Sequence, residues 1–279
     1  MKLIKPKFEI LEQRPGISGI YRMIELAGRT CYRSEDKITP DSAVAFVDRM
    51  IKSGHGAMLE HGTVYLIIPF EYIDISEKFD IPIVSNIVKK YQNNPYTKWR
   101  LRDDGFSQLA FITTNLRVLV ENNWMDDLQY VCEPTEYHEK RITVRLTCDR
   151  GVSHEFVRHR VFSFAQESTR YCNYIKSKFG GSVTFITPPW LKQEDELEFE
   201  EDMQVIENLY FKWLNKGWTA QQARGFLCNF LKTELVMTGT IEQWEGFFKL
   251  RDAKDAHPQA RELAQPLHEE FIKKGLIKV

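Results

Sequence analysis

The chain has 279 residues, of which 43% are hydrophobic and 28% charged, as in globular proteins and unlike disordered or fibrous ones. Its 38 basic and 39 acidic residues give a formal net charge of -1, which provides no general attraction to nucleic acid or to a membrane surface. No window holds the roughly 18 apolar residues of a membrane span, and the N-terminal residues contain no signal-peptide core. We therefore expect a cytoplasmic protein with neither nucleic acid nor membrane as a partner.

The five cysteines are widely spaced, odd in number and include no Cys-x-x-Cys pair. This pattern indicates neither a disulfide framework nor a zinc site, so we expect a reducing environment and no metal. An acidic run at residues 194–202 is interpreted as the charged start of a helix and a solvated face rather than as a metal site.

Hydrophobic periodicity predicts four elements in the first part of the chain. Residues 7–11 alternate and predict a short edge strand, whereas residues 19–31 have helical spacing. Pro40 suits the first turn of a second helix, which continues to about residue 52. Residues 62–69 then predict a buried strand.

The segment 71–140 matches no pattern of known function. Residues 98–102 and 109–113 could form a hairpin, and residues 116–121 and 124–132 have helical spacing. The segment could enlarge an oligomer interface or cover a cleft.

Strands and helices alternate in the next part of the chain. A half-buried strand is predicted at 141–148 and a helix at 151–159, followed by a polar stretch at 163–173 and a strand at 183–187. The acidic run then opens a long helix that ends at about residue 216.

The last part of the chain is mainly helical. Thr219 is predicted to cap a helix that continues to about residue 231, and a strand is expected at 234–237. Two helices follow, at about 241–251 and 258–274. No repeat, low-complexity segment or linker divides the chain. The predicted fold is α+β, a single catalytic domain over 1–279 with a central, mostly antiparallel sheet flanked by helices.

The densest chemical signal is the segment 158–171, whose sequence is RHRVFSFAQESTRY. Arginine presents a planar set of donors that matches phosphate and carboxylate groups, and serine hydroxyls and loop N–H groups add further donors. Tyr171 could stack on a heterocycle. The segment suits an anionic, planar ligand such as a nucleotide, although a solvated loop of salt bridges has the same composition.

The pattern Arg-His-Arg, seven residues, then Ser resembles the signature motif of flavin-dependent thymidylate synthases. Seven residues separate Arg160 from Ser168. Ser163 within this gap and the pair Arg170-Tyr171 after it match the extended form of the motif.

Further segments support this resemblance. Residues 54–61 (GHGAMLEH) resemble the family's Gly-His-x-x-x-x-Glu-His segment, and Leu250-Arg251 followed by residues 256–259 (AHPQ) resembles its C-terminal element. Arg224 lies at the expected distance before that element. The resemblance covers about residues 16–70 and 141–275.

The chain departs from the family pattern in two places. The family commonly has Asn-Glu-Gln-Ser where residues 165–168 are Ala-Gln-Glu-Ser, so the acid and the amide are exchanged. The family often has flavin-binding asparagines where this chain has Thr240 and Gly246.

The resemblance implies which residues bind the ligands. Arg224 could contact a phosphate in the site of a neighbouring subunit, and Thr63, two residues after His61, would point the same way along a strand. The implied dUMP contacts are Glu155, Arg158, Gln166, Glu167, Ser168, Thr169, Arg170, Arg224 and Arg251. The implied FAD contacts are His61, Thr63, Arg158, His159, Arg160 and Gln166.

The catalytic residues that the resemblance implies are Arg251 and Ser168. A guanidinium against the uracil carbonyl and N3 would stabilise negative charge on the ring and make C5 a better nucleophile. The alternative is an arginine at a helix C-terminus whose positive charge interacts favourably with the helix dipole. No general base is evident beside Ser168, which favours a hydrogen-bonding role. Cys172 is the one nearby thiol, but it lies outside the motif.

The resemblance implies the reductive methylation of dUMP to dTMP, with FAD and NADPH as cofactors and methylenetetrahydrofolate as the one-carbon donor. It also implies a homotetramer with sites at subunit interfaces. The sequence does not choose between NADPH and NADH. Two other classes stay open: a nucleotide- or RNA-binding protein, which the near-neutral charge disfavours, and a flavoenzyme of another class. No Gly-x-Gly-x-x-Gly follows a predicted strand, so a Rossmann-type domain is not expected.

Overall fold

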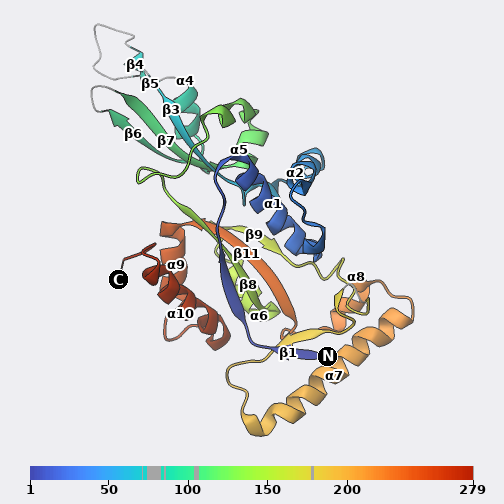
Figure 1. The fold of residues 1–279 in the computed structure, drawn as a ribbon. Helices are drawn as coiled ribbons and strands as arrows, with labels where there is room; N and C mark the ends of the chain where they lie inside the picture. Colours follow the sequence, from blue (N-terminus) through green and yellow to red (C-terminus); the bar gives the residue numbers. More distant parts are fainter. Residues whose placement is uncertain (71, 74–82, 85, 104–106, 177–178, 279) are drawn as a thin grey trace. The chain divides into compact units, whose positions relative to one another are not determined.

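A computed structural model describes residues 1–70, 72–73, 83–84, 86–103, 107–176 and 179–278 (Figure 1). The chain divides into two compact units. Helices and antiparallel strand pairs occur in both, which confirms the predicted α+β class. The first unit contains Met1–Leu11, Ala27–Lys37 and Ile142–Val279, and the second unit contains Glu12–Leu26 and Ile38–Arg141.

The first unit is built on a four-stranded sheet in the order β2-β8-β11-β9 (Figure 1). β2 (Lys7–Leu11) is an edge strand, as predicted, and pairs antiparallel with β8 (Arg141–Asp149). β11 (Lys232–Thr240) pairs antiparallel with β9 (Ser163–Gln166), the other edge. Segments that are far apart in the sequence therefore share one sheet.

Three helices bury one face of this sheet. They are α6 (Arg150–Phe156), α9 (Ile241–Arg251) and α10 (Pro258–Lys273). Leu146 of β8 and Leu235 of β11 are fully buried in a cluster with apolar residues of these helices. Side chains alternate along a strand, so the neighbours of Leu146 in β8 and of Leu235 in β11 point to the opposite face of the sheet. That face carries polar and charged groups.

A second cluster completes the first unit. β1 (Lys2–Ile4) pairs in parallel with β10 (Thr184–Ile186), and the long helix α7 (Glu196–Asn215) buries Tyr210 in the same cluster as Phe185. Short helical turns also belong to the first unit. They are η4 (Gln193–Asp195), α8 (Ala220–Ala223), η5 (Arg224–Phe226) and, at the end of α1, η1 (Glu35–Lys37).

The second unit has its own three-stranded antiparallel sheet in the order β3-β7-β6, formed by β3 (Thr63–Pro69), β7 (Gln108–Asn115) and β6 (Lys98–Asp103). Its buried cluster includes Leu66 and Ile112. The other elements are α2 (Ser42–Lys52), α3 (Gly56–Leu59), β4 (Tyr72–Ile73), β5 (Ile83–Val84), α4 (Asn86–Gln92), α5 (Leu116–Glu121) and η2 (Met125–Tyr130).

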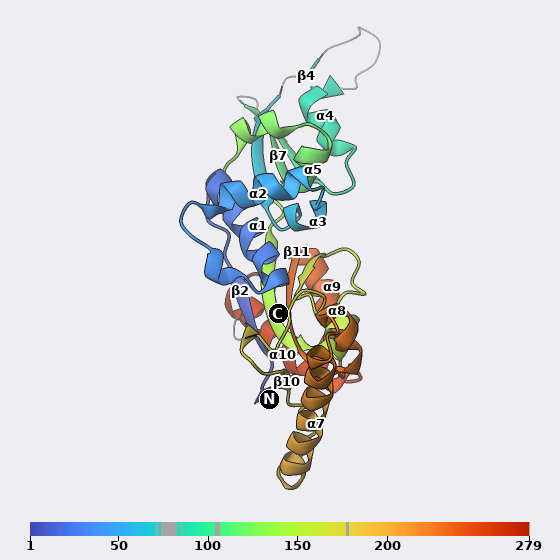
Figure 2. The ribbon, with the colours of Figure 1, turned by 90° about the vertical axis from the view of Figure 1, so that its right-hand side faces the viewer.

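Helix α1 (Gly16–Tyr32; Figure 2) contributes residues to both units, because the division falls between Leu26 and Ala27. Its C-terminal end is closed by Arg33, whose φ of 44° lies in the left-handed region. The N–H of Ser34 donates to the carbonyl of Arg29 at 3.1 Å, which satisfies one of the last helical carbonyls.

Most predicted elements are confirmed, including the 98–102/109–113 hairpin, whose residues 104–106 lie outside the described residues. The prediction of a polar stretch at 163–173 was wrong for residues 163–166, because β11 offers them a strand partner. The helix predicted from Thr219 to about 231 ends at Ala223. The carbonyls of Asn229 and Leu231 instead accept from the N–H of Arg150, which needs a non-helical backbone there.

Two features are absent from the described residues. None of the helices that the structure describes has the length and apolar character needed to cross a membrane. The same residues hold no group of three or more His, Cys, Asp or Glu side chains that could bind a metal ion.

Candidate active site

The Arg-His-Arg segment lies in a turn between α6 and β9. Asp149 caps the start of α6, since its carboxylate accepts from the N–H of Val152 at 2.8 Å. The helix ends at Phe156, two residues before Arg158, rather than at the predicted residue 159. The N–H of His159 donates back to the carbonyl of Phe156 at 3.1 Å, so the turn is tied to the helix end.

Arg251, the last residue of α9, is held by the end of α6 and by this turn through three hydrogen bonds. Its Nε–H donates to Nε2 of His159 at 3.0 Å. One Nη donates to the carboxylate of Glu155 at 2.5 Å and the other donates to the Glu155 carbonyl at 2.8 Å. The structure thus brings together three predicted site residues, and two of the five guanidinium N–H groups are left for a ligand.

His159 is held as a neutral imidazole. Burial and then the neighbouring Arg251 charge lower its pKa from 6.5 to about 4. Because Nε2 accepts from Arg251, the single ring proton of the neutral form lies on Nδ1. The ring also packs against Phe247 of α9 at a centroid distance of 5.1 Å, which fixes its orientation.

Arg158 and Arg160 are exposed on either side of His159. Within the part of the chain that the structure describes, neither guanidinium has a hydrogen bond or ion pair. The turn therefore presents two uncommitted positive charges beside a neutral ring, which suits an anionic ligand.

Gln166 and Glu167, the exchanged pair, point to different faces of the sheet. The Gln166 amide donates to Oγ of Ser153 at 2.8 Å and to Oγ1 of Thr233 at 3.3 Å. Glu167 is 2% exposed and accepts from the Tyr174 hydroxyl at 3.1 Å. Nζ of Lys232 also donates to the Glu167 carboxylate at 2.9 Å, so this buried acid is paired within the protein.

Ser168, Thr169 and Arg170 follow in the loop after β9. The N–H of Ser168 donates to the carbonyl of Cys31 at 2.9 Å, and its Oγ accepts from the N–H of Arg170 at 3.3 Å. Arg224 donates to Oγ1 of Thr169 at 3.2 Å, so these two predicted residues are also brought together. No His or carboxylate of the described residues bonds to the Ser168 hydroxyl, which favours the hydrogen-bonding role.

Arg170 is exposed and donates to the Gln221 side chain at 2.9 Å. Its guanidinium also lies 5.5 Å from the centroid of the Tyr171 ring. By contrast, the Cys172 thiol is fully buried, and burial raises its pKa to about 12. A thiol with that pKa forms almost no thiolate at neutral pH, which disfavours Cys172 as a nucleophile.

His61 and Thr63 lie in the second unit, and both are buried. His61 lies in the turn before β3, so the expectation that His61 and Thr63 point the same way along one strand was wrong. The Thr63 hydroxyl accepts from Arg141 at 3.3 Å, and its backbone N–H donates to the Gln13 side chain at 2.9 Å.

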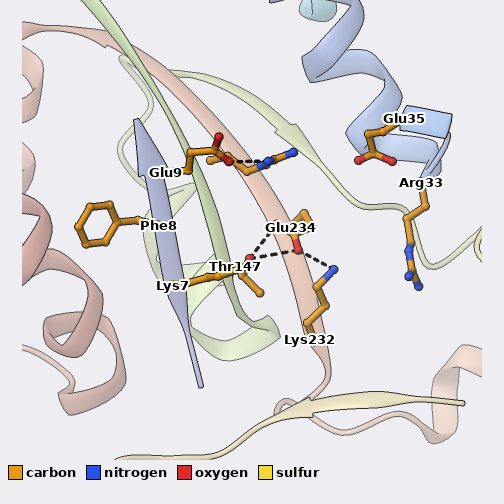
Figure 3. Close-up of a pocket in the computed structure, with 9 residues that line it drawn as sticks. Lys7, Phe8, Glu9, Arg33, Glu35, Thr147, Lys232 and Glu234 are labelled. Atoms are coloured by element: carbon orange, nitrogen blue, oxygen red, sulfur yellow. Dashed lines mark hydrogen bonds and ion pairs between the residues drawn. The ribbon is translucent and has the colours of Figure 1, made fainter. Parts of the chain in front are cut away.

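The structure adds a group of site neighbours that the sequence did not indicate. A pocket of about 530 Å³ lies on the polar face of the first unit's sheet (Figure 3). Lys232 and Glu234 occupy alternate positions of β11, and both face the pocket. This alternation of charged residues was the one sign of the pocket in the sequence. The other lining residues are Lys7, Phe8, Glu9, Arg33, Glu35, Arg145 and Thr147.

The family model Thy1, described as "Thymidylate synthase complementing protein", matches residues 133–274, half of the chain. The chain belongs to this family. The matched range contains the Arg-His-Arg turn, the loop after β9 and Arg251, whereas His61 and Thr63 precede it.

Two relatives of this Thy1 family member are both described as "Flavin-dependent thymidylate synthase". The protein from Pyrococcus furiosus is 31% identical over 133 residues, 47% of this chain and 54% of the relative. The protein from Corynebacterium aurimucosum is 25% identical over 262 residues, 89% of this chain and 74% of the relative. The chain spans about half the length of the Pyrococcus relatives that it matches, 54% and 52%.

A solved structure is also similar to this chain. It is the UMP/dUMP methylase PolB from Streptomyces cacaoi bound with 5-Br dUMP, which is 15% identical and covers 98% of this chain and 93% of its own. The TM-score is 0.44, which is too low to bear on function.

Proposed function

We propose that this Thy1 family member is a flavin-dependent thymidylate synthase that methylates dUMP to dTMP. The observation that carries the proposal is the arrangement of Arg251, which donates three hydrogen bonds to Glu155 and His159 and is thereby fixed beside the Arg-His-Arg turn. The family match and the names of the curated relatives support it.

Arg251 and Ser168 act on the nucleotide ring in this proposal. A guanidinium whose direction is already fixed can stabilise negative charge on the uracil carbonyl without reorganising during the reaction. Glu155 orients Arg251 and keeps it in place, while the remaining N–H groups face the ligand. Ser168 donates a hydrogen bond and forms no covalent adduct.

The dUMP phosphate is bound by cations of the loop after β9 and of the turn that follows α8. Arg170 and Arg224 supply the charge, and Thr169 holds Arg224 through its hydroxyl. Gln166, Glu167 and Arg158 complete the proposed nucleotide site, Glu167 indirectly, because it is buried.

The residues present fit an FAD cofactor. Arg158 and Arg160 are exposed cations without partners among the described residues, which suits the diphosphate of a dinucleotide, and the neutral His159 between them can donate from Nδ1. The proposed flavin residues also include His61, Thr63 and Gln166. When bound, the flavin supplies the hydride that completes the methyl group.

The remaining parts of the proposal concern partners. NADPH reduces the flavin, and methylenetetrahydrofolate donates the one-carbon unit. The protein works in the cytoplasm as a homotetramer with sites at subunit interfaces, and 1–279 acts as one catalytic domain.

The test is anaerobic turnover of purified protein with FAD, NADPH, methylenetetrahydrofolate and dUMP. We expect dTMP together with tetrahydrofolate rather than dihydrofolate. Arg251→Lys should lower kcat about 100-fold or more, because lysine cannot make the three bonds that fix the charge. Arg261→Lys is the matched control, since among the described residues the Arg261 side chain donates to the Asp252 carbonyl, and Arg261 is not one of the proposed ligand contacts.

Two outcomes would contradict the proposal. If FAD binds but no dTMP forms, the chain is a flavoprotein of another class. If Cys172→Ala abolishes turnover in folded protein while Arg251→Lys does not, the reaction uses a covalent adduct and the role given to Arg251 is wrong.

A further inference from the structure

A buried charge network lies directly beneath the loop after β9, here called the motif loop (residues 167–172). Glu167 is at its start, and the exposed fraction of the Glu167 side chain is 1%. One carboxylate oxygen accepts from Nζ of Lys232 at 2.9 Å, and the other accepts from the Tyr174 hydroxyl at 3.1 Å. Nε of Arg33 lies 4.0 Å from the same carboxylate.

Lys232 is shared between two carboxylates. Its Nζ is 2.9 Å from Glu167 and 2.7 Å from Glu234, and 13% of its side chain is exposed, at the wall of the pocket in Figure 3. The Thr147 hydroxyl donates to Glu234 at 3.0 Å. Burial alone would lower the pKa of Lys232, but Glu167 and Glu234 outweigh it and raise the pKa. Lys232 is therefore charged at all ordinary pH values.

The exchange of acid and amide in the motif explains why this cation is needed. Gln166 and Glu167 are adjacent, so their side chains leave opposite faces of the sheet. Gln166 takes the face that carries Ser153 and Thr233, and the acid falls on the face that carries Lys232. A carboxylate buried there without a cation would be costly, and the backbone would have to move to expose it.

That movement would displace the residues proposed to bind the nucleotide. The N–H of Glu167 donates to the Glu234 carbonyl at 2.8 Å, and the next N–H, that of Ser168, donates to the Cys31 carbonyl at 2.9 Å. The N–H groups of Tyr171 and Cys172 both donate to the Ser168 carbonyl, so the turn is built on Ser168. Fixing Glu167 thus fixes where the loop leaves β9.

We propose that Lys232 is a positioning residue for the motif loop, which it holds by neutralising the buried Glu167. A correctly placed motif loop strengthens dUMP binding, and this consequence alone rests on the proposed function. Lys232 itself does not contact the ligand.

The first experiment measures amide hydrogen exchange of the motif loop. In Lys232→Met, the N–H groups of Ser168, Tyr171 and Cys172 should exchange about tenfold faster or more, because local opening no longer separates an ion pair. The amides of β8 serve as an internal reference for global stability. Lys232→Arg should keep wild-type exchange, since it keeps the charge.

Arg145→Met is the matched control variant. Arg145 lies on the same face of the sheet and pairs with Glu9, whose side chain is 56% exposed, so removing it leaves no buried charge. We expect no change in the motif loop. The proposal is overturned if Lys232→Met leaves the loop amides unchanged relative to β8, or if Arg145→Met accelerates them equally.

The second experiment measures the dissociation constant of dUMP by calorimetry on FAD-loaded protein. Lys232→Met should weaken binding by about 10- to 100-fold, because the motif-loop residues proposed to bind the nucleotide would no longer be held in position. Glu167→Gln in the same chain should restore the exchange of the loop amides to within about threefold of wild type, because the double variant buries no unpaired charge.

The two experiments separate the two hypotheses. If wild-type protein does not bind dUMP, the proposed function fails, and the exchange data still decide whether Lys232 positions the loop. If Lys232→Met accelerates exchange but leaves dUMP affinity unchanged, Lys232 positions the loop and the stated consequence for dUMP binding is wrong. If the double variant exchanges as fast as the single one, the positioning role is wrong.

Discussion

His159 stays neutral in the folded protein because burial and Arg251 lower its pKa to about 4, below the usual 6.5. The unfolded chain therefore binds more protons than the folded one between these values. The stabilisation from His159 is fully present above about pH 6.5 and is lost as the pH falls toward 4. Because the ring is partly exposed, solvent screens part of the interaction that lowers this pKa. We therefore expect the free energy of unfolding to fall by about 2 kcal/mol.

Urea unfolding at pH 7 and at pH 4 measures this loss. In His159→Gln, the amide oxygen can still accept from Arg251 but does not titrate, so its stability should fall less than that of wild type over the same interval. Equal losses in the two proteins would show that His159 does not carry the pH dependence.

At the scale of single residues, the sequence predicted the motif but not its supports. Arg251 was identified by its local Leu-Arg context, yet its partner Glu155 is 96 residues away, and no spacing rule joins them. Lys232 was missed because its partner Glu167 is 65 residues distant. Such pairs depend on which strands become neighbours, which a single sequence does not determine.

Among the secondary-structure elements, β11 approaches the Arg-His-Arg turn too closely to carry a side chain at Gly239. A Cβ there would lie 2.5 Å from the ring of Phe162, which is buried against Trp244 at a centroid distance of 4.8 Å. Gly239→Ala should therefore destabilise the protein by about 1–3 kcal/mol and disturb the turn.

Gly246→Ala is the matched comparison for this prediction. Gly246 lies inside α9, and nothing described lies within 4 Å of a Cβ built there, so alanine should stabilise the helix by about 0.5–1 kcal/mol. Chemical denaturation of both variants checks the opposite signs. If Gly239→Ala is as stable as wild type, the close packing of Phe162 against β11 is not maintained in solution.

Elements with strong periodicity were predicted well, and those that depend on a partner were not. α9 begins and ends at the predicted residues, because its caps are local: Thr240 and Gln243 form a capping box. β9 was not predicted, since only its pairing with β11 makes it a strand. The helix after Thr219 was predicted too long, because the backbone near its expected end is not helical. There the carbonyls of Asn229 and Leu231 accept from the N–H of the distant Arg150.

At the scale of the whole molecule, the family match and the two compact units coincide only in part. Residues 133–274 fall almost entirely in the first unit, whereas the segment 71–140 lies in the second. The second unit has its own buried cluster, separate from the two clusters of the first. Whether such units unfold together depends on the elements that belong to both.

Helix α1 is such an element, because residues up to Leu26 belong to the second unit and residues from Ala27 to the first. Unfolding either unit alone would break the helical hydrogen bonds that cross this point, so we expect one cooperative transition. Leu66→Ala in the second unit and Leu235→Ala in the first should each cost about 2–5 kcal/mol, because both residues are fully buried. Scanning calorimetry should then record a single peak that each variant moves to lower temperature. Two peaks, each moved by only one variant, would mean that the chain consists of two independently folding domains.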